Sequence, residues 1–365
     1  MEFYHTKISN KSKDLVNEIL DTSFISAGKL ADKFEYLLSE KLTLKNPVSV
    51  NSGTSALHLA LIVAGIKAGD EVILPAQTFI ATGFVILMVG AKPVFADIQL
   101  DTGNIDPLSI RKKITTRTKA IIPVHWGGYP CDLDEINLIA IEHNLIVIED
   151  AAHALGASYK NKPIGSISNF TCFSFQAIKH ITSGDGGAIC SLTDSDYYQL
   201  KRRRWFDIDR ENSKPDILGE RIYDAVNIGY KYHMNDLAAA IAIGNLESFN
   251  EVQNRLEFIY NFYVKELKNV SGVTLLNYKN DRKSAFWLFT LKVDNRIDFI
   301  KSLKSENIPA SVVHLRIDKN SIFGGINNDL NNQKLFDEKQ VSIPIHVGLS
   351  NDDLYKIVNT INKGW

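Results

Sequence analysis

Cysteine is scarce in this sequence. The 365 residues include only three cysteines, Cys131, Cys172 and Cys190, and no two of them form a CxxC pair. Scattered cysteines of this kind provide neither the disulfide framework of a small secreted domain nor the clustered thiolates of a zinc or iron–sulfur centre. We therefore expect a reducing compartment and no metal site.

Long hydrophobic runs and a large net charge are also missing. No apolar run approaches the ~20 residues that a membrane-spanning helix requires, and the opening residues, MEFYHTKISNKSKD, lack the apolar core of a secretory signal. The formal net charge is -1, so no basic field is available to hold a nucleic-acid backbone or an anionic membrane. We expect a cytoplasmic protein that acts on small molecules, without nucleic-acid or membrane partners.

The composition, 45% hydrophobic and 23% charged, is typical of a globular protein, and the length suggests about two domains. Between residues 45 and 190, short apolar runs alternate with helical stretches, which is the pattern of βαβ units on a mostly parallel sheet. The predicted strands, nearly all apolar and hence buried on both faces, are residues 71–74, 93–96, 120–124, 145–148, 171–175 and 187–190. We predict an α/β large domain over residues 1–250.

The remaining residues, 251–365, predict a smaller α+β domain. A polar segment at 207–220 is expected to be a loop, and helical periodicity follows at 234–246 and 252–270. Apolar runs at 273–276, 286–293 and 310–313 then alternate with helices, and we expect them to be strands.

Small hydroxylated residues open the buried helix predicted at 54–64. Gly53, Thr54 and Ser55 would place free N–H groups and the positive end of the helix dipole at its first turn, which suits a phosphate. A plain Ser/Thr N-cap explains the same residues equally simply.

Two further segments carry reactive groups. The strand ending in Glu149 and Asp150, followed by His153, would bring an acid to the sheet edge, where it could hold a protonated pyridine nitrogen or merely cap a helix. Lys179 lies between Phe175, Ile178 and Ile181 and precedes a glycine-rich turn. Most lysines are solvated surface charges, but an apolar setting lowers the pKa of an amine and makes it a better nucleophile.

Together the segments supply an anion site, a carboxylate and an amine, which is the set that pyridoxal phosphate (PLP) requires. Six stretches in this order resemble the DegT/DnrJ/StrS sugar aminotransferases of PLP fold type I: NSGTSALHLAL, GDEVILPAQTFIAT, GAKPVFADI, IEDAAHALGA, FSFQAIKHITSGDGGAI and GYKYHMNDLAAAIA. The resemblance implies a large domain with a mixed, mostly parallel sheet flanked by helices, a smaller C-terminal domain, and a homodimer with shared active sites.

The resemblance also implies roles for individual residues. Lys179 would form the Schiff base with the cofactor and move the proton, and Asp150 would pair with the pyridinium nitrogen. The other cofactor contacts implied are Gly53, Thr54, Ser55 and Ser174 at the phosphate, Phe79 stacked on the ring, His153 beside the ring oxygen, and Gln176.

Several positions depart from the family pattern or face the substrate. The family often has asparagine at the positions of Lys231 and His180, and histidine at the position of Gln176. Lys231 would contact the phosphate across the dimer interface. Arg204 and Trp205 end a basic run that either faces a nucleotide diphosphate or forms an exposed helix face. His314 is a further expected substrate contact.

We predict an aminotransferase that moves the amino group of L-glutamate, through pyridoxamine phosphate, to a nucleotide-linked 4-keto-6-deoxy sugar for surface polysaccharide or glycan biosynthesis. A 3-keto or a non-nucleotide keto-sugar remains an alternative, and loops at 23–30, 203–220 and 312–323 would decide between them. A PLP-dependent sugar dehydratase would carry histidine in place of Lys179, and a non-catalytic regulator would have lost one of the motifs. A Rossmann dehydrogenase would need a GxGxxG segment, which is missing.

Overall fold

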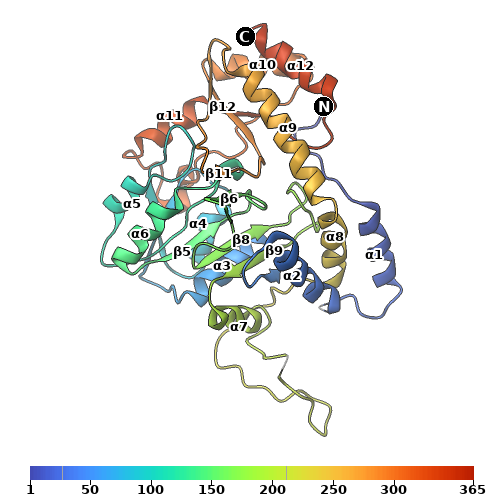
Figure 1. Cartoon of the computed structure of the whole chain (residues 1–365). Helices are drawn as coiled ribbons and strands as arrows, with labels where there is room; N and C mark the ends of the chain where they lie inside the picture. Colours follow the sequence, from blue (N-terminus) through green and yellow to red (C-terminus); the bar gives the residue numbers. More distant parts are fainter. Residues whose placement is uncertain (27, 211) are drawn as a thin grey trace.

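The computed structural model describes residues 1–365 except positions 27 and 211. Ala27 and Glu211, which belong to the 23–30 and 203–220 loops that we expect to select the sugar, lie outside the described residues. In Figure 1 a central sheet with helices on both sides forms the body of the molecule, and a second α/β layer, which carries the C-terminus, packs above it.

The central sheet has seven strands in the order β1-β9-β8-β5-β4-β2-β3. Its members are β1 (Val48–Val50), β2 (Glu71–Pro75), β3 (Lys92–Ala96), β4 (Thr118–Ile121), β5 (Ile146–Asp150), β8 (Phe170–Ser174) and β9 (Gly187–Ser191). Strands β3, β2, β4, β5 and β8 run parallel to one another, whereas β9 runs antiparallel to both β8 and β1. All six predicted strands are present, and β1 is an addition, since three residues are too few to give a periodic signal.

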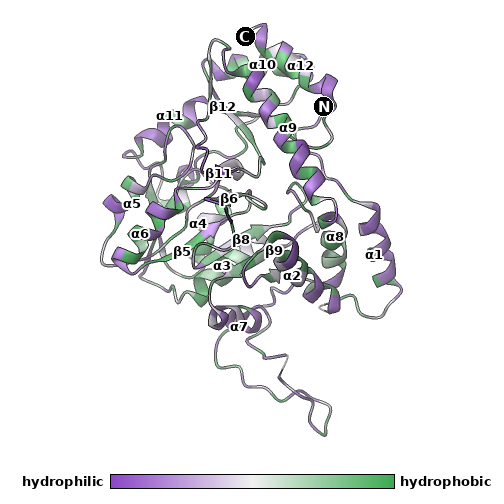
Figure 2. Ribbon diagram, in the orientation of Figure 1, coloured by the Kyte–Doolittle hydropathy of each residue, from purple (hydrophilic) through white to green (hydrophobic). Residues whose placement is uncertain are grey.

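Helices cover both faces of this sheet. They are α1 (Asn10–Leu20), α2 (Lys29–Leu42), α3 (Gly53–Val63), α4 (Ile80–Met88), α5 (Pro107–Lys113), α6 (Leu133–His143), α7 (Asp194–Arg203) and α8 (Asp236–Leu246). Two apolar clusters lie one on each side of the strands, and α3 belongs almost wholly to one of them. Figure 2 shows the same division, because the outer helices carry hydrophilic faces while α3 and the strands are hydrophobic.

The C-terminal layer contains a three-stranded antiparallel sheet in the order β10-β12-β13. Its elements are β10 (Val273–Leu275), β12 (Phe289–Val293), β13 (Gln340–Ile343), α9 (Phe249–Leu267), α10 (Arg296–Ser305), α11 (Asn331–Lys339) and α12 (Asn351–Asn362). The strand predicted at 310–313 is wrong. The Ser311 hydroxyl accepts a hydrogen bond from the Val313 amide at 3.0 Å, and Val313 has a φ of 59°, so the chain turns there. The third strand is instead β13.

Short elements join the two layers. They are β6 (Ser158–Tyr159), β7 (Lys162–Pro163), β11 (Arg282–Lys283) and three 3-10 turns at Trp126–Gly128, Ile317–Lys319 and Ser321–Phe323. Strand β11 pairs with β6. The apolar cores separate near the start of α9, since Phe249 belongs to a core of the large sheet and Val252 to the C-terminal core. We propose that the domains divide there, at residue 250.

The parallel strands place several polar side chains at one edge of the central sheet. Strand β5 ends at Asp150 and β8 ends at Ser174. Helix α3 begins at Gly53, where it meets β8 and β9. Ligands of open α/β sheets bind beyond the carboxyl ends of the strands. No helix in the described part of the chain is long and apolar enough to cross a membrane.

Candidate active site

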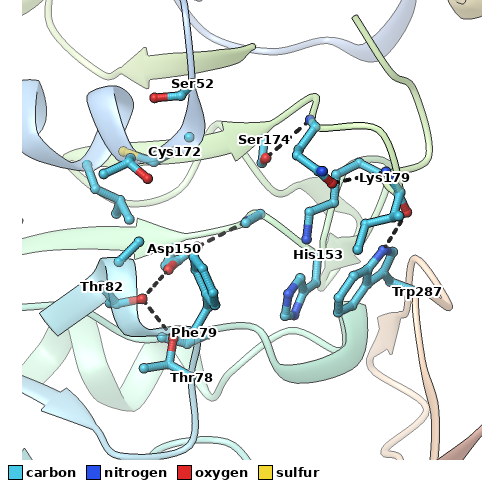
Figure 3. A pocket seen from close by; sticks show the side chains of 18 of the residues that line it. Ser52, Thr78, Phe79, Thr82, Asp150, His153, Cys172, Ser174, Lys179 and Trp287 are labelled. Atoms are coloured by element: carbon cyan, nitrogen blue, oxygen red, sulfur yellow. Dashed lines mark hydrogen bonds between the residues drawn. The ribbon is translucent and has the colours of Figure 1, made fainter. Parts of the chain in front are cut away.

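A cavity of about 350 Å³ opens at this edge of the sheet. Figure 3 shows it from close by, with the side chains that line it drawn as sticks. The predicted residues that line the cavity are Gly53, Thr54, Phe79, Asp150, His153, Ser174, Gln176, Lys179 and His314. The fold therefore brings together residues from segments that are far apart in the sequence.

The side chain of Lys179 enters the cavity from the loop that follows β8. Its Nζ lies 3.8 Å from the ring centroid of Trp287, and the Trp287 indole N–H donates to the Ile178 carbonyl at 3.0 Å. Burial lowers the pKa of Lys179 to about 7, against the opposing attraction of Asp150. The lowered pKa favours the uncharged amine, which is the form that acts as a nucleophile.

Asp150 lies at the end of β5 with its carboxylate held by two donors. The Thr82 hydroxyl donates to Oδ2 at 2.7 Å, and the Ala152 amide donates to Oδ1 at 3.2 Å. Burial raises the pKa of Asp150, while both hydrogen bonds lower it. A cationic partner in the cavity would favour the ionised carboxylate, and Figure 3 shows Asp150 next to Phe79, with a dashed line joining it to Thr82.

The start of α3 forms one end of the cavity. The Ser52 side chain caps the helix by accepting from the Ser55 amide at 3.0 Å. A Cβ built on Gly53 would lie 2.9 Å from the Ser174 Cβ, so only glycine lets the two segments approach this closely. Ser55 does not line the cavity, because its buried hydroxyl donates to the Asn51 side chain at 2.6 Å. Ser52 lines it instead.

His153 is buried against Trp287, with ring centroids 3.7 Å apart and planes at 15°. Burial is the largest cause that lowers the pKa of His153 well below its usual range, so the ring is neutral. Its Nδ1 is buried without a hydrogen-bond partner, which is costly unless a ligand supplies one. With the carboxylate of Asp150, the amine of Lys179 and the open N–H groups at α3, this unpartnered nitrogen completes a set of groups that fits PLP.

Besides Ser55, four predicted site residues lie elsewhere. His180 lines a separate cavity and its Nε2–H donates to the Ala285 carbonyl at 2.7 Å. Arg204 and Trp205 line a third cavity beyond α7, where the guanidinium group of Arg204 pairs with Glu35. Lys231 is exposed, with its Nζ 6.0 Å from the Trp205 ring. The structure thus leaves these four outside the cavity of about 350 Å³, which we call the front cavity.

Sequence reasoning missed Ser52, Thr78, Thr82 and Trp287 as cavity residues. Thr82 follows Phe79 by three positions and so shares its helical face, a spacing that could have indicated it. Trp287 comes from the C-terminal layer, and nothing local in its sequence marks it as a neighbour of Lys179. Among the residues that the structure describes, no group of His, Cys, Asp and Glu side chains is arranged to hold a metal ion.

Residues 6–362 match the family model described as the DegT/DnrJ/EryC1/StrS aminotransferase family. The chain belongs to this family. The relatives include the spore coat polysaccharide biosynthesis protein SpsC of Bacillus subtilis, which is 35% identical over 95% of this chain and 92% of its own length. The UDP-4-amino-4-deoxy-L-arabinose–oxoglutarate aminotransferase of Shewanella sediminis is 31% identical over 98% of this chain and 96% of its own.

Among solved structures, the sugar aminotransferase CalS13 of Micromonospora echinospora superposes with a TM-score of 0.95, at 32% identity and with full coverage of both chains. These similarities confirm the predicted fold class, PLP fold type I with a mostly parallel sheet between helices. They also confirm that the protein is a sugar aminotransferase and that its cofactor is PLP.

Proposed function

We propose that this sugar aminotransferase moves the amino group of L-glutamate to a nucleotide-linked 4-keto-6-deoxy sugar. One observation supports the proposal most directly: the Lys179 amine, the Asp150 carboxylate and the N-terminus of α3 open into a single cavity of about 350 Å³. No other cavity described in the structure combines these three groups.

The same cavity suggests how the cofactor is held. In our proposal Gly53 and Thr54 at the start of α3 bind the phosphate, together with Ser174 and Gln176, because N–H groups at a helix start attract anions. Asp150 binds the ring nitrogen, His153 donates or accepts at the ring oxygen through its unpartnered Nδ1, and Phe79 covers one face of the ring. When bound there, PLP supplies an aldehyde carbon and an electron-withdrawing ring.

Lys179 would then act as nucleophile and as proton carrier. A general base works best when its pKa lies near the working pH, and burial brings the pKa of Lys179 to about 7. The amine can therefore take a proton from the α-carbon of the donor and return it to a neighbouring carbon without large cost in either direction. Asp150, kept ionised by a cationic ring nitrogen, would in turn keep that nitrogen protonated, so that the ring withdraws electrons.

The donor and acceptor are proposed from the relatives. The name of the Shewanella protein includes oxoglutarate and a UDP-linked 4-amino-4-deoxy sugar, which supports glutamate as donor and carbon 4 as the aminated position. The name of SpsC supports a role in surface polysaccharide biosynthesis. A 3-keto or non-nucleotide sugar is the second candidate. A dehydratase is disfavoured because an amine, rather than an imidazole, stands at position 179.

A homodimer is proposed from residues 206–210 and 212–230, which extend from the body below α7 in Figure 1 and which we call the exposed arm. Several of its apolar side chains, among them Ile217, Leu218 and Ile228, are largely exposed, and contiguous exposed apolar groups usually mark an interface. In such a dimer Lys231, Arg204 and Trp205 would serve the partner's active site, the first at the phosphate and the others toward a nucleotide diphosphate. We place the enzyme in the cytoplasm, where its three buried cysteines stay reduced.

The proposal is tested by incubating the purified protein with PLP, L-glutamate and a panel of keto-sugars while 2-oxoglutarate is measured. The panel contains nucleotide-linked 4-keto-6-deoxy hexoses, a 4-keto pentose, a 3-keto sugar and the corresponding free sugars. We expect release of 2-oxoglutarate in amounts equal to the aminated nucleotide sugar. Turnover with free sugars alone would refute the nucleotide requirement, and no release with any acceptor would refute the assigned donor and acceptor.

A further inference from the structure

A second, smaller cavity lies behind Lys179. Its volume is about 50 Å³, and it shares Ile178, Lys179 and Trp287 with the front cavity, so these residues separate the two. The N-terminal segment covers this side, where Tyr4 stacks on Trp287 with centroids 5.7 Å apart. We call this space, lined also by His180, His346 and Val252, the rear cavity.

Two polar atoms in the walls of the rear cavity are buried without partners, the Tyr4 hydroxyl and Nδ1 of His346. The His346 ring is 8% exposed, and its Nε2–H donates to the Glu2 carbonyl at 3.1 Å, which leaves Nδ1 as an acceptor. His180 is arranged alike, since its Nε2–H donates to the Ala285 carbonyl and its Nδ1 is an acceptor. Buried polar groups in native proteins are nearly always hydrogen-bonded, so these atoms require a partner.

Water is the partner that fits. A water molecule needs roughly 10–15 Å³ of such a cavity and two to four polar neighbours. The rear cavity, at about 50 Å³, has room for a few waters, and its walls include the Tyr4 hydroxyl, two imidazole acceptors and Lys179, which lines both cavities. Exposed His5 and Lys7 are also among its lining, so the cavity reaches the protein surface.

We propose that the rear cavity holds a short chain of ordered water through which Lys179 exchanges protons with solvent while substrate fills the front cavity. This inference rests on the proposed function, because it concerns the proton that Lys179 carries during transamination. A substrate in the front cavity fills the space on that side of Lys179, and the rear cavity, with His5 and Lys7 in its lining, then offers a route to bulk water.

The exchange is a pair of proton transfers and involves no oxidant or reductant. The Lys179 ammonium gives a proton to the adjacent water, which passes one on toward the surface as its own O–H bond breaks. A proton from bulk water returns along the same path to the amine. The Tyr4 hydroxyl and His346 Nδ1 hold the first waters by one donated and one accepted hydrogen bond, and so act as positioning residues.

The first test is structural and needs no turnover. A crystal structure of the wild-type protein at a resolution that shows water should reveal ordered water within hydrogen-bond distance of both the Tyr4 hydroxyl and His346 Nδ1. The same water should be lost or displaced in Tyr4→Phe, which keeps the ring on Trp287 but removes the hydroxyl. An empty rear cavity in the wild-type protein would overturn the proposal, whatever the activity of the enzyme.

The second test follows the proton itself. With L-glutamate deuterated at the α-carbon, part of the deuterium that Lys179 removes is carried to the cofactor and part is lost to solvent. We expect Tyr4→Phe, and Val252→Phe, which fills the cavity from α9, to lower the solvent loss several-fold relative to internal transfer. Tyr263→Phe is the matched control, because it also removes a buried tyrosine hydroxyl, which donates to the Pro344 carbonyl, and Tyr263 does not line the cavity.

Unchanged partition of the deuterium in both cavity variants would overturn the route even if the water is present. A protein that does not react with glutamate would refute the proposed donor. The crystal structure would still show whether the rear cavity holds ordered water. The two failures are therefore distinguishable.

Discussion

Replacing Thr82 with valine removes one hydroxyl beneath the cofactor site and keeps the shape of the side chain. The Thr82 hydroxyl donates to Asp150 Oδ2 at 2.7 Å and shares a second hydrogen bond of 2.7 Å with Thr78. All three side chains are buried. Because Asp150 already has a pKa raised by burial, loss of this donor should raise that pKa further and favour the neutral carboxyl group.

The size of the effect follows from the kind of hydrogen bond that is lost. A hydrogen bond to a charged group contributes about 1.5–3 kcal/mol, and each ~1.4 kcal/mol corresponds to a tenfold change in an equilibrium constant. If PLP binds to the ionised form of Asp150, the dissociation constant for PLP in Thr82→Val should therefore rise by about tenfold to a hundredfold. Equilibrium titration of the cofactor-free protein, followed by PLP absorbance, measures this constant directly.

Thr82→Ser is the matched control, since it restores the hydroxyl and should recover most of the wild-type affinity. Thermal unfolding of the cofactor-free variants shows whether each one is folded. The reasoning would be refuted if Thr82→Val were folded and bound PLP with the wild-type dissociation constant, because Asp150 would then not depend on this donor.

Four further predictions use the same cavity and the exposed arm. Lys179→Ala should fold, yet borohydride should no longer fix PLP to the chain; fixation at another residue would disprove the assignment of the amine. Gly53→Ala should weaken PLP binding at least tenfold in the same titration, because the new Cβ would meet Ser174, and an unchanged dissociation constant would show that the phosphate lies elsewhere. In the cofactor-free protein burial raises the pKa of Asp150, so the folded state keeps this proton to a higher pH than the unfolded chain does, and the free energy of unfolding should fall as pH rises from the usual carboxyl pKa of about 3.9 to the raised one. Urea titrations at several pH values should show a smaller fall in Asp150→Asn, and an equal fall would mean that another group causes it. Leu218→Asp should convert a dimer to monomers by sedimentation, and a dimer that persists would remove the arm from the interface.

Much of the large domain follows from local sequence patterns. Buried parallel strands are apolar along their whole length, so residues such as 71–74 and 145–148 predict β2 and β5 to within two residues at either end. The C-terminal layer is harder, because residues 310–313 have the β-branched composition of a strand while one serine hydroxyl bends the chain. Strand β13 contains Gln340 and Ser342, whose side chains are buried by tertiary contacts that no local pattern shows.

The candidate site likewise contains residues that local sequence patterns predict and residues that only tertiary contacts bring in. Asp150, Ser174 and Lys179 follow strands of one parallel sheet, so their shared edge can be inferred from the strand pattern alone. Trp287 lies more than a hundred positions after Lys179 and is brought to it by tertiary contacts, among them a 2.9 Å hydrogen bond from the Trp287 amide to the Gly127 carbonyl. Arg204 shows what a local pattern leaves open, since a basic run suggests a ligand contact while the fold pairs its guanidinium group with Glu35, and a contact with the partner's ligand depends on the proposed dimer.

The front cavity of the cofactor-free protein is electrostatically unfavourable, and that feature links stability to function. Burial disfavours the charged form of Asp150 and of Lys179 alike, which raises one pKa and lowers the other. A cationic ring nitrogen beside Asp150 and a bond to the Lys179 nitrogen would remove both penalties at once. Groups that are costly in the free protein are thus the ones that cofactor binding relieves. The protein should accordingly gain about 2.7 kcal/mol of stability when free PLP stands at a hundred times its dissociation constant, and Asp150→Asn should show a much smaller gain at the same concentration.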